Sequence, residues 1–256
     1  MPKLIIPDWI GAPGGIACFS TERSGGFSTP PFDDGTGSGQ GGFNLGINAG
    51  DDLQRVMQNR QRLREHCPSE PVWLRQVHGA VVVEAVLAAR SAQPVDADAS
   101  FTTVSGVVCA VTTADCLPVL FCDVAGRVVG AAHAGWRGLA AGVLQNTVAA
   151  MRTAGATDLL AWLGPAIGPG HFEVGFDVHA AFAERDRRAA AAFRPIAGSS
   201  GKYLADIYHL ARLVLADCGV ARISGGGHCT VGEAGRFFSY RRDHQTGRMA
   251  SLIWIK

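Results

Sequence analysis

The chain has 256 residues, of which 47% are hydrophobic and 18% charged, and its formal net charge is +1. This composition is typical of one compact globular domain, which we expect to cover residues 1–256. Because no polybasic stretch, no apolar run of roughly 18 residues and no signal peptide are visible, the sequence argues against nucleic-acid and membrane partners. We expect a cytoplasmic protein with a small-molecule substrate.

The first half of the chain is expected to contain a loop, a helix and several strands. The glycine-rich segment 35–42 predicts a flexible surface loop. Two aspartates followed by apolar residues at helical spacing predict an amphipathic helix over 51–63. Runs rich in β-branched residues then predict strands over 72–77, 81–87, 106–112, 119–122 and 127–132.

The second half mixes helices and strands. A glycine turn leads into a predicted helix over 139–151, and a strand over 159–163 follows. Further helices are predicted over 177–185 and 202–218, and closing strands over 222–224, 237–241 and 249–255. Since strands and helices do not alternate regularly, we expect the α/β class in its α+β form. This means mixed β-sheets with helices packed outside them rather than a doubly wound parallel sheet.

Two histidines and one cysteine stand where strand-like runs break off, namely His78, Cys116 and His133. Two imidazoles and a thiolate at such positions can form a three-ligand zinc site that leaves a fourth position open, as catalytic zinc sites do. Pro118 cannot donate to a sheet ladder, so we expect an edge or bulged strand that exposes the Cys116 thiol. The other six cysteines are expected to be reduced and mostly buried.

The spacing of the three residues leaves other interpretations open. Separations of 38 and 17 residues match no zinc finger or ribbon. The histidines could be hydrogen-bonded core residues beside an inert cysteine. Without a metal, Cys116 could also act as a nucleophile with His133 or His78 as its base.

Neighbouring charged residues suggest proton transfer and anion binding. Asp115 could relay a proton or hold a turn. The glycine turn around Arg137 offers backbone N–H groups at a helix start, which would suit phosphate, although a tight connection with a solvated Arg137 explains it equally well. Arg23, Arg241 and Arg242 are further candidate anion clamps.

Histidine content argues against a multicopper centre. Such a centre holds its copper cluster largely through His-x-His pairs, but this chain has eight histidines and no such pair. Oxidation of polyphenols across several coppers is therefore disfavoured. A single copper ion remains an alternative to zinc, because copper competes well for these ligands.

Five segments of the chain resemble the YfiH/YlmD-type laccase-like (multicopper polyphenol oxidase) domain family, and they are residues 71–79, 113–121, 133–138, 162–169 and 237–243. The resemblance extends nearly end to end and implies a YfiH-like fold. It also implies that the zinc ligands are His78, Cys116 and His133. The pocket residues that it implies are Arg23, Asn44, Gln76 and Asp115, whereas His228 and Arg241 receive no role.

The resemblance implies a zinc-dependent enzyme of purine nucleosides. It would phosphorolyse adenosine, inosine and methylthioadenosine with phosphate held by Arg23 or Arg137. It would also deaminate adenosine, with Asp115 relaying the proton. Bacterial relatives also point to a hydrolase that edits peptidoglycan precursors, and a non-catalytic scaffold stabilised by zinc is the third hypothesis.

Overall fold

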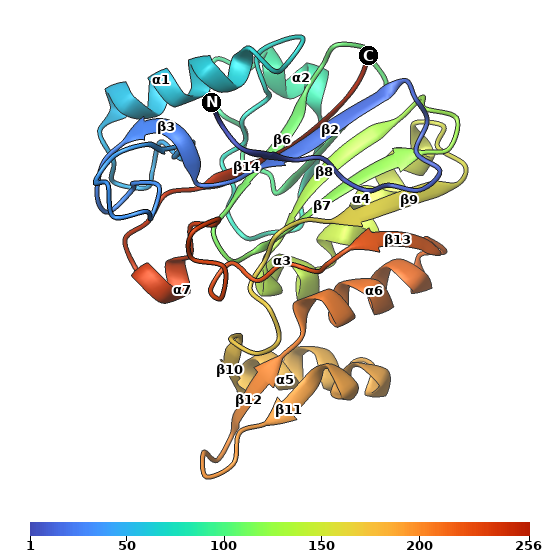
Figure 1. The fold of residues 1–256 in the computed structure, drawn as a ribbon. Coiled ribbons are helices and arrows are strands. Elements are labelled where there is room, and N and C mark those ends of the chain that lie inside the picture. Colours follow the sequence, from blue (N-terminus) through green and yellow to red (C-terminus); the bar gives the residue numbers. More distant parts are fainter.

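The computed structural model describes residues 1–256, which form three β-sheets surrounded by helices (Figure 1). The strands are β1 Leu4–Ile5, β2 Ile16–Thr21, β3 Ser24–Ser28, β4 Val82–Glu84, β5 Ala99–Thr102, β6 Cys109–Thr113, β7 Leu117–Asp123, β8 Val129–Ala134, β9 Leu159–Leu163, β10 Glu173–Gly175, β11 Phe193–Pro195, β12 Lys202–Ala205, β13 Arg222–Gly225 and β14 Met249–Ile255. The helices are α1 Leu53–Arg64, α2 Ala85–Ala89, α3 Trp136–Ala141, α4 Val143–Thr153, α5 Phe176–Ala183, the 3-10 helix η1 Arg187–Ala192, α6 Ile207–Asp217 and α7 Tyr240–Asp243.

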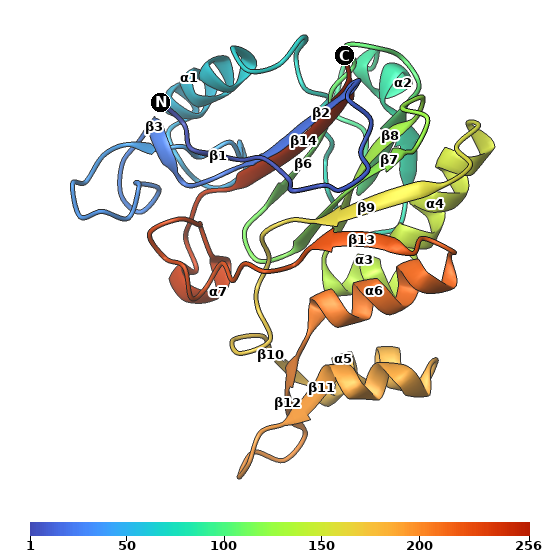
Figure 2. The same cartoon turned by 45° about the vertical axis from the view of Figure 1, so that its right-hand side comes forward.

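The expected mixed sheets with helices outside them are confirmed. The largest sheet has the order β13-β9-β7-β8-β5-β4, and a second sheet has the order β1-β2-β14-β6. In the largest sheet, β13 pairs parallel to β9 and β4 parallel to β5, whereas the central pairs are antiparallel. A third, small sheet of β10, β12 and β11 projects from the main body together with α5 (Figure 2).

Alternating burial along the central strands shows how the layers pack. In β7, Phe121 joins a core beneath α3, α4 and α6, while Leu120 joins a second core that also includes residues of β6 and β14. In β14, Ile253 belongs to that second core, while Leu252 belongs to a third core with Leu63 of α1. Because neighbouring residues of a strand face opposite sides, the order of layers is helix, four-stranded sheet, six-stranded sheet, helices.

Four predicted elements were wrong in type or extent. Residues 72–77 form only isolated bridges, and 81–87 is a strand only to Glu84 before α2 begins. The expected helix over 139–151 is two helices, because Gly142 adopts a left-handed conformation with φ of 98°. Residues 202–205 are β12, since Asp206 caps the following helix through the N–H of His209.

The expected closing strand over 237–241 was also wrong. Phe237 and Phe238 are buried, but the chain then turns into α7, where the Ser239 hydroxyl accepts a hydrogen bond from the backbone N–H of Arg242. A serine in this position satisfies an otherwise unpaired N–H at a helix start. The segment 237–243 therefore supplies a capped helical turn rather than a sheet edge.

The expectation for Pro118 was wrong in its main point, because β7 lies in the middle of the six-stranded sheet. Pro118 is opposite His133 of β8, and its carbonyl accepts a hydrogen bond from the N–H of Gly164, just beyond the end of β9. The nitrogen of a residue in an antiparallel ladder points to the same side as its carbonyl. The Pro118 nitrogen therefore points toward Gly164, beyond the last paired residues of β7 and β9, which are Val119 and Leu163. A missing N–H at this position requires neither an edge strand nor a bulge.

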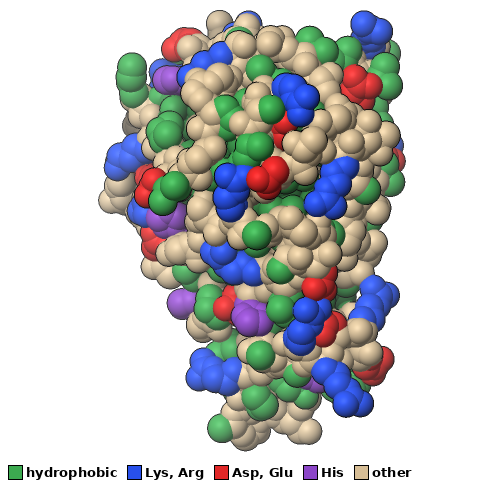
Figure 3. All heavy atoms as spheres, turned by 90° about the vertical axis from the view of Figure 1, so that its right-hand side faces the viewer, with side chains coloured by type: hydrophobic (Ala, Val, Ile, Leu, Met, Phe, Trp, Pro, Cys, Tyr) green, Lys and Arg blue, Asp and Glu red, His purple; other side chains and the backbone are tan.

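The surface carries charges of both signs. On the face drawn in Figure 3, basic and acidic side chains are interspersed, and the molecule narrows toward the small sheet. No helix is both long enough and apolar enough to cross a bilayer.

Candidate metal centre and cavity

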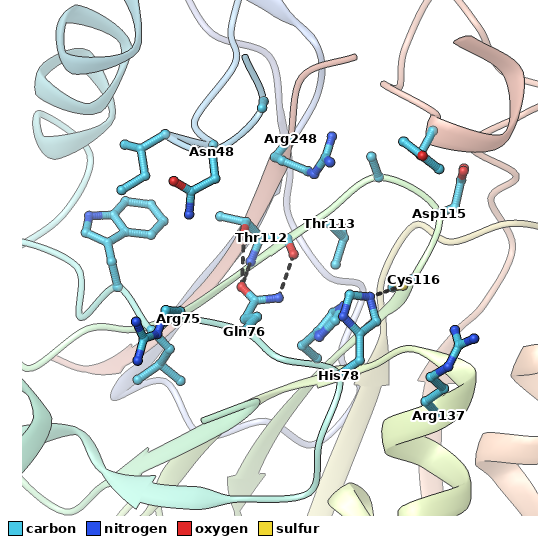
Figure 4. A pocket seen from close by; sticks show the side chains of 18 of the residues that line it. Asn48, Arg75, Gln76, His78, Thr112, Thr113, Asp115, Cys116, Arg137 and Arg248 are labelled. Carbon is cyan, nitrogen blue, oxygen red and sulfur yellow. Dashed lines mark hydrogen bonds between the residues drawn. The ribbon is translucent and has the colours of Figure 1, made fainter. Parts of the chain in front are cut away.

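A cavity of about 930 Å³ opens at the end of the six-stranded sheet where β8 ends and β5 and β7 begin (Figure 4). Its walls come mainly from the segments 46–49, 73–78, 112–116 and 136–137 and from residues 240, 241 and 248, with single residues from other parts of the chain. Its polar lining comes mainly from Asn48, Arg60, Arg75, Gln76, His78, Thr112, Thr113, Asp115, Cys116, His133, Arg137, Arg241 and Arg248. Five arginines and one carboxylate line the same space, so the cavity favours an anionic ligand.

The structure brings the three predicted metal ligands together at this end of the sheet. His78 lies in the loop before β4, Cys116 directly precedes β7, and His133 is the last residue but one of β8. One ligand atom from each lies within 4.8 Å of the others, and Cys116 Sγ is 3.8 Å from His78 Nε2. His133 is buried, Cys116 half-buried and His78 exposed, so the group is open to the cavity on one side. Two nitrogens and one thiolate are a donor set that suits zinc or copper.

Asp98 connects both histidines to the sheet and was not found from the sequence. Its fully buried carboxylate accepts hydrogen bonds from the backbone N–H groups of residues 77, 78 and 79, and its Oδ1 lies 2.8 Å from His133 Nδ1. His78 has a left-handed backbone with φ of 60°, which is unfavourable for a residue other than glycine. The three hydrogen bonds stabilise that conformation. The bond to Nδ1 leaves Nε2 of His133 as the nitrogen that can bind a metal.

The charges of Cys116 and His133 depend on each other. Burial opposes charge on both groups, but their mutual attraction lowers the pKa of the Cys116 thiol and raises that of the His133 imidazole, with Asp98 adding to the second effect. Without a metal, the pair is therefore stabilised as thiolate and imidazolium. The same environment favours the thiolate that a metal ligand must be.

Asp115 lines the cavity, but its carboxylate is already engaged. Oδ1 accepts a hydrogen bond of 2.6 Å from the Thr230 hydroxyl, and Oδ2 accepts one of 2.6 Å from the backbone N–H of Arg241. Its left-handed φ of 96° turns the side chain away from the neighbouring Cys116, toward the C-terminal segment (Figure 4). Asp115 thus joins the metal side of the cavity to its opposite wall.

Of the other predicted pocket residues, Gln76 and Arg137 line the cavity. The Gln76 amide is engaged with Thr112, because its oxygen accepts the backbone N–H and the hydroxyl and its nitrogen donates to the carbonyl. Arg137 lies over the Trp136 ring, 4.3 Å from its centroid, and its guanidinium makes no hydrogen bond to the protein. Arg137 therefore keeps all its donors for a ligand.

Arg23 and Asn44 do not line the cavity, contrary to the expectation from the resemblance. The guanidinium of Arg23 is buried and donates to the carbonyls of Asp33 and Ala234. Asn44 is also buried, and its Oδ1 accepts the backbone N–H groups of Gly46 and Arg248. Asn44 supports two lining residues from behind, whereas Arg23 fastens the N-terminal loops to the C-terminal segment.

The remaining arginines were only partly identified in advance. Arg241 lines the cavity and Arg242 does not, since its guanidinium donates to carbonyls of residues 230, 231 and 237. Arg248 was missed, although it is half-buried in the cavity wall and burial lowers the pKa of its guanidinium. A desolvated guanidinium is stabilised by an anion beside it. The signal was weak, because a single arginine near the C-terminus resembles a surface charge.

Comparisons with known proteins agree with this architecture. The family described as "Multi-copper polyphenol oxidoreductase laccase" matches residues 17–256. A protein of Escherichia coli (strain K12) named "Purine nucleoside phosphorylase YfiH" is 52% identical over 257 aligned residues, which cover the whole of both chains. Among solved structures, the Neisseria meningitidis protein NMB0706 has a TM-score of 0.90 and 48% identity, with 99% of each chain covered. YlmD from Geobacillus stearothermophilus has a TM-score of 0.84 and 32% identity, and covers 99% of this chain and all of its own.

Proposed function

Because this chain belongs to the laccase-like multicopper polyphenol oxidoreductase family, in which its full-length Escherichia coli relative is named a purine nucleoside phosphorylase, we propose that it is a metal-dependent purine nucleoside phosphorylase. The observation that carries the proposal is the joining, in one cavity of about 930 Å³, of the His78, Cys116 and His133 group with unpaired arginine donors. Adenosine, inosine and methylthioadenosine are the substrates that we expect.

His78, Cys116 and His133 would hold the metal, for which zinc is our first candidate and copper the alternative. A metal held by these residues would supply a Lewis acid to the reaction. Asp98 orients the His133 ring and fixes the backbone at His78, so that both imidazoles are directed before the metal binds.

Arg137 and Arg248 are the residues that we assign to phosphate. Arg137 has no hydrogen bond to the protein, and Arg248 uses only one of its terminal nitrogens, which donates to the carbonyls of residues 246 and 247. Both therefore have donors free for phosphate oxygens, and paired guanidinium donors suit phosphate geometry. Asn44 holds the backbone N–H of Arg248 at 2.8 Å and so orients it.

The bond changes of phosphorolysis define what the cavity must do. An oxygen of phosphate forms a bond to the anomeric carbon while the glycosidic C–N bond breaks and the purine leaves with the electron pair. The arginines would hold phosphate at the reacting carbon and offset its charge. Because both Asp115 oxygens already accept hydrogen bonds, a positioning role for Asp115 is better supported than the proton relay expected from the sequence.

Adenosine deamination is a second proposed activity, favoured by the donor set. Zinc held by histidine and cysteine ligands activates water in nucleobase deaminases, where a separate carboxylate moves the proton. Here Asp115 is the one carboxylate that lines the cavity. The engagement of its two oxygens makes this activity the weaker of the two proposals.

The test is a substrate panel with the zinc-loaded protein. We expect inosine and adenosine to give ribose 1-phosphate only when phosphate is present, and inosine formed from adenosine would report deamination. Cys116→Ala should abolish turnover, whereas Cys218→Ala, at a cysteine outside the cavity, should not. Failure with every nucleoside, or equal activity of wild type and Cys116→Ala, would refute the proposal. Turnover of peptidoglycan precursors or phenols instead would support the alternative hypotheses.

A further inference from the structure

A second cysteine lies against an imidazole outside the metal centre. Cys229 Sγ is 3.4 Å from His171 Nδ1, and it also accepts hydrogen bonds from the backbone N–H groups of Gly168 at 3.2 Å and Gly232 at 3.4 Å. None of these residues lines the cavity. The two backbone N–H groups stabilise negative charge on the sulfur, and a thiol beside an imidazole is a common arrangement for a nucleophile.

Local backbone structure builds this arrangement. Ala166 and Cys229 form a parallel β-bridge, which brings the segments 166–171 and 228–233 together. A Cβ on Gly168 would lie 3.1 Å from Cys229 Sγ, so a glycine allows the backbone N–H to approach the sulfur. The Glu233 carboxylate accepts the N–H of Cys229 and would repel a thiolate, but Arg236 donates to the same carboxylate at 2.7 Å and offsets its charge.

The other cysteines differ from Cys229 in burial and partners. Burial raises the pKa of the thiols of Cys18, Cys67, Cys109 and Cys122 to about 12. Cys218 has a pKa raised by burial as well, and no imidazole contacts its sulfur. Cys229 is half-buried beside an exposed His171. With Cys116 engaged at the metal centre, Cys229 is the thiol that best combines access with a base.

We propose that Cys229 and His171 form a modification site for low-molecular-weight disulfides. His171 Nδ1 takes the thiol proton, and Cys229 Sγ attacks one sulfur of the disulfide. A new S–S bond forms to Cys229, the original S–S bond breaks, and the other half leaves as a thiolate. Cys229 is thereby oxidised and the released thiol is the reduced product. The site is independent of the proposed function.

The site lies next to the cavity wall, so a modification of Cys229 can affect that wall. Thr230 follows Cys229 directly, and its hydroxyl donates to Asp115 in the wall. Its backbone N–H donates to the carbonyl of Ala166, next to the lining residue Ile167. The mixed disulfide therefore forms one residue away from a contact that shapes the substrate cavity.

The experiment treats the full-length, zinc-loaded protein with glutathione disulfide and maps the adduct by peptide mass spectrometry. We expect one glutathione per chain, on Cys229, and none in Cys229→Ser on the same timescale. His171→Gln should slow the reaction by roughly tenfold or more, since it removes the base. Cys218→Ser and His209→Gln, which alter a thiol and an imidazole elsewhere, should react like wild type.

Two results would overturn the proposal. The first is modification of Cys229 in wild type no faster than modification of Cys218. The second is an unchanged rate in His171→Gln. Both measurements use proteins that retain Cys229, so they remain decisive even where Cys229→Ser folds poorly. The metal content of each sample, measured alongside, verifies that Cys116 stays ligated.

Discussion

The two walls of the cavity differ in what holds them. The histidine wall carries His78, Cys116 and His133. There, the buried carboxylate of Asp98 binds the 77–79 backbone and His133, and the backbone carbonyl of Asp98 also accepts the N–H of His133 at 2.7 Å. On the arginine wall, Asp115, Arg241 and Arg248 are held by hydrogen bonds between segments outside the two larger sheets, such as those from the Thr230 hydroxyl and the Arg241 N–H to the Asp115 carboxylate.

This difference fits the separate demands of a metal and a substrate. Metal affinity depends on ligand atoms held in a fixed geometry, which the sheet edge and a shared buried carboxylate provide. Substrate entry requires a wall that can adjust, and loop contacts permit this more readily than a packed sheet. Disturbing the histidine wall should therefore change metal binding, while disturbing the arginine wall should leave it intact.

The largest effect is expected from Asp98→Asn. An asparagine of the same size keeps one oxygen but puts an N–H₂ group where the carboxylate accepts backbone N–H groups, so both histidines lose part of their orientation. We expect metal affinity to fall roughly 10- to 100-fold, measured by competition with a chromophoric chelator. The matched control is Asp96→Asn, two residues away, where the carboxylate is exposed and pairs with Arg75. Equal losses in both variants would contradict the assigned role of Asp98.

A smaller loss of metal affinity is expected from Gly135→Ala. A Cβ at this position would lie 2.9 Å from Cys116 Sγ and 3.2 Å from His78 Cδ2, although the backbone φ of −59° suits alanine. One of the two ligands must then move, and we expect affinity to fall about tenfold with little change in the unfolding midpoint. Gly227→Ala, where an added Cβ meets nothing within 4 Å, is the control. Unchanged metal affinity in Gly135→Ala would show that the ligand group adapts more freely than its contacts indicate.

On the arginine wall, Thr230→Val should leave metal affinity unchanged. The substitution removes the hydroxyl that donates to Asp115 Oδ1, and we expect a loss of about 1 kcal/mol in the free energy of unfolding and a raised KM for the nucleoside. Denaturant titration and steady-state kinetics measure the two effects. Thr153→Val removes a hydroxyl that donates to the carbonyl of Ala149 on the surface of α4 and serves as the control. A loss of metal affinity in Thr230→Val would mean that the two walls are not independent.

Local sequence patterns were sufficient for much of the fold and for the metal group. β7, β8, β9 and β14 are buried on both faces, so they appear as short continuous apolar runs. α1 and α6 carry regular apolar stripes and capping aspartates. His78, Cys116 and His133 were found because residue types with metal chemistry stood next to such runs, and the edge of one sheet does bring them together.

The parts that the sequence did not predict depend on partners far away in the chain. β2 is stabilised by pairing with β14, more than 200 residues later. Asp98 gains its role only through contacts with residues 77–79 and His133, and its neighbours suggest no more than a polar turn. Arg23 illustrates the opposite error, because a residue type suited to an anion instead binds carbonyls between two loops.

The smallest effect concerns pH and the metal-free protein. Burial opposes charge on Cys116, yet His133 and His78 bring the pKa of its thiol from 9.0 to about 6; burial also opposes charge on His133, yet Cys116 and Asp98 bring its pKa from 6.5 to about 9. The thiolate contributes stability above pH 9 that is lost as pH falls through about 6, while the imidazolium contributes stability below pH 6.5 that is lost as pH rises through about 9.

The pH dependences of these two stability contributions cancel between pH 6.5 and 9, because the pair binds the same number of protons in the folded and the unfolded protein in that window. The pair should therefore add almost no pH dependence to the free energy of unfolding of chelated wild type in that window, although it still stabilises the folded state. Cys116→Ala removes the pH-dependent contribution of the thiolate and leaves that of His133 beside Asp98. The stability of this variant should therefore fall as pH rises, unlike that of Cys218→Ala. Parallel pH profiles for all three proteins in urea titrations would show that the pKa of the Cys116 thiol is the same in the folded and unfolded protein, and that the histidine wall is held by hydrogen bonds without the ion pair.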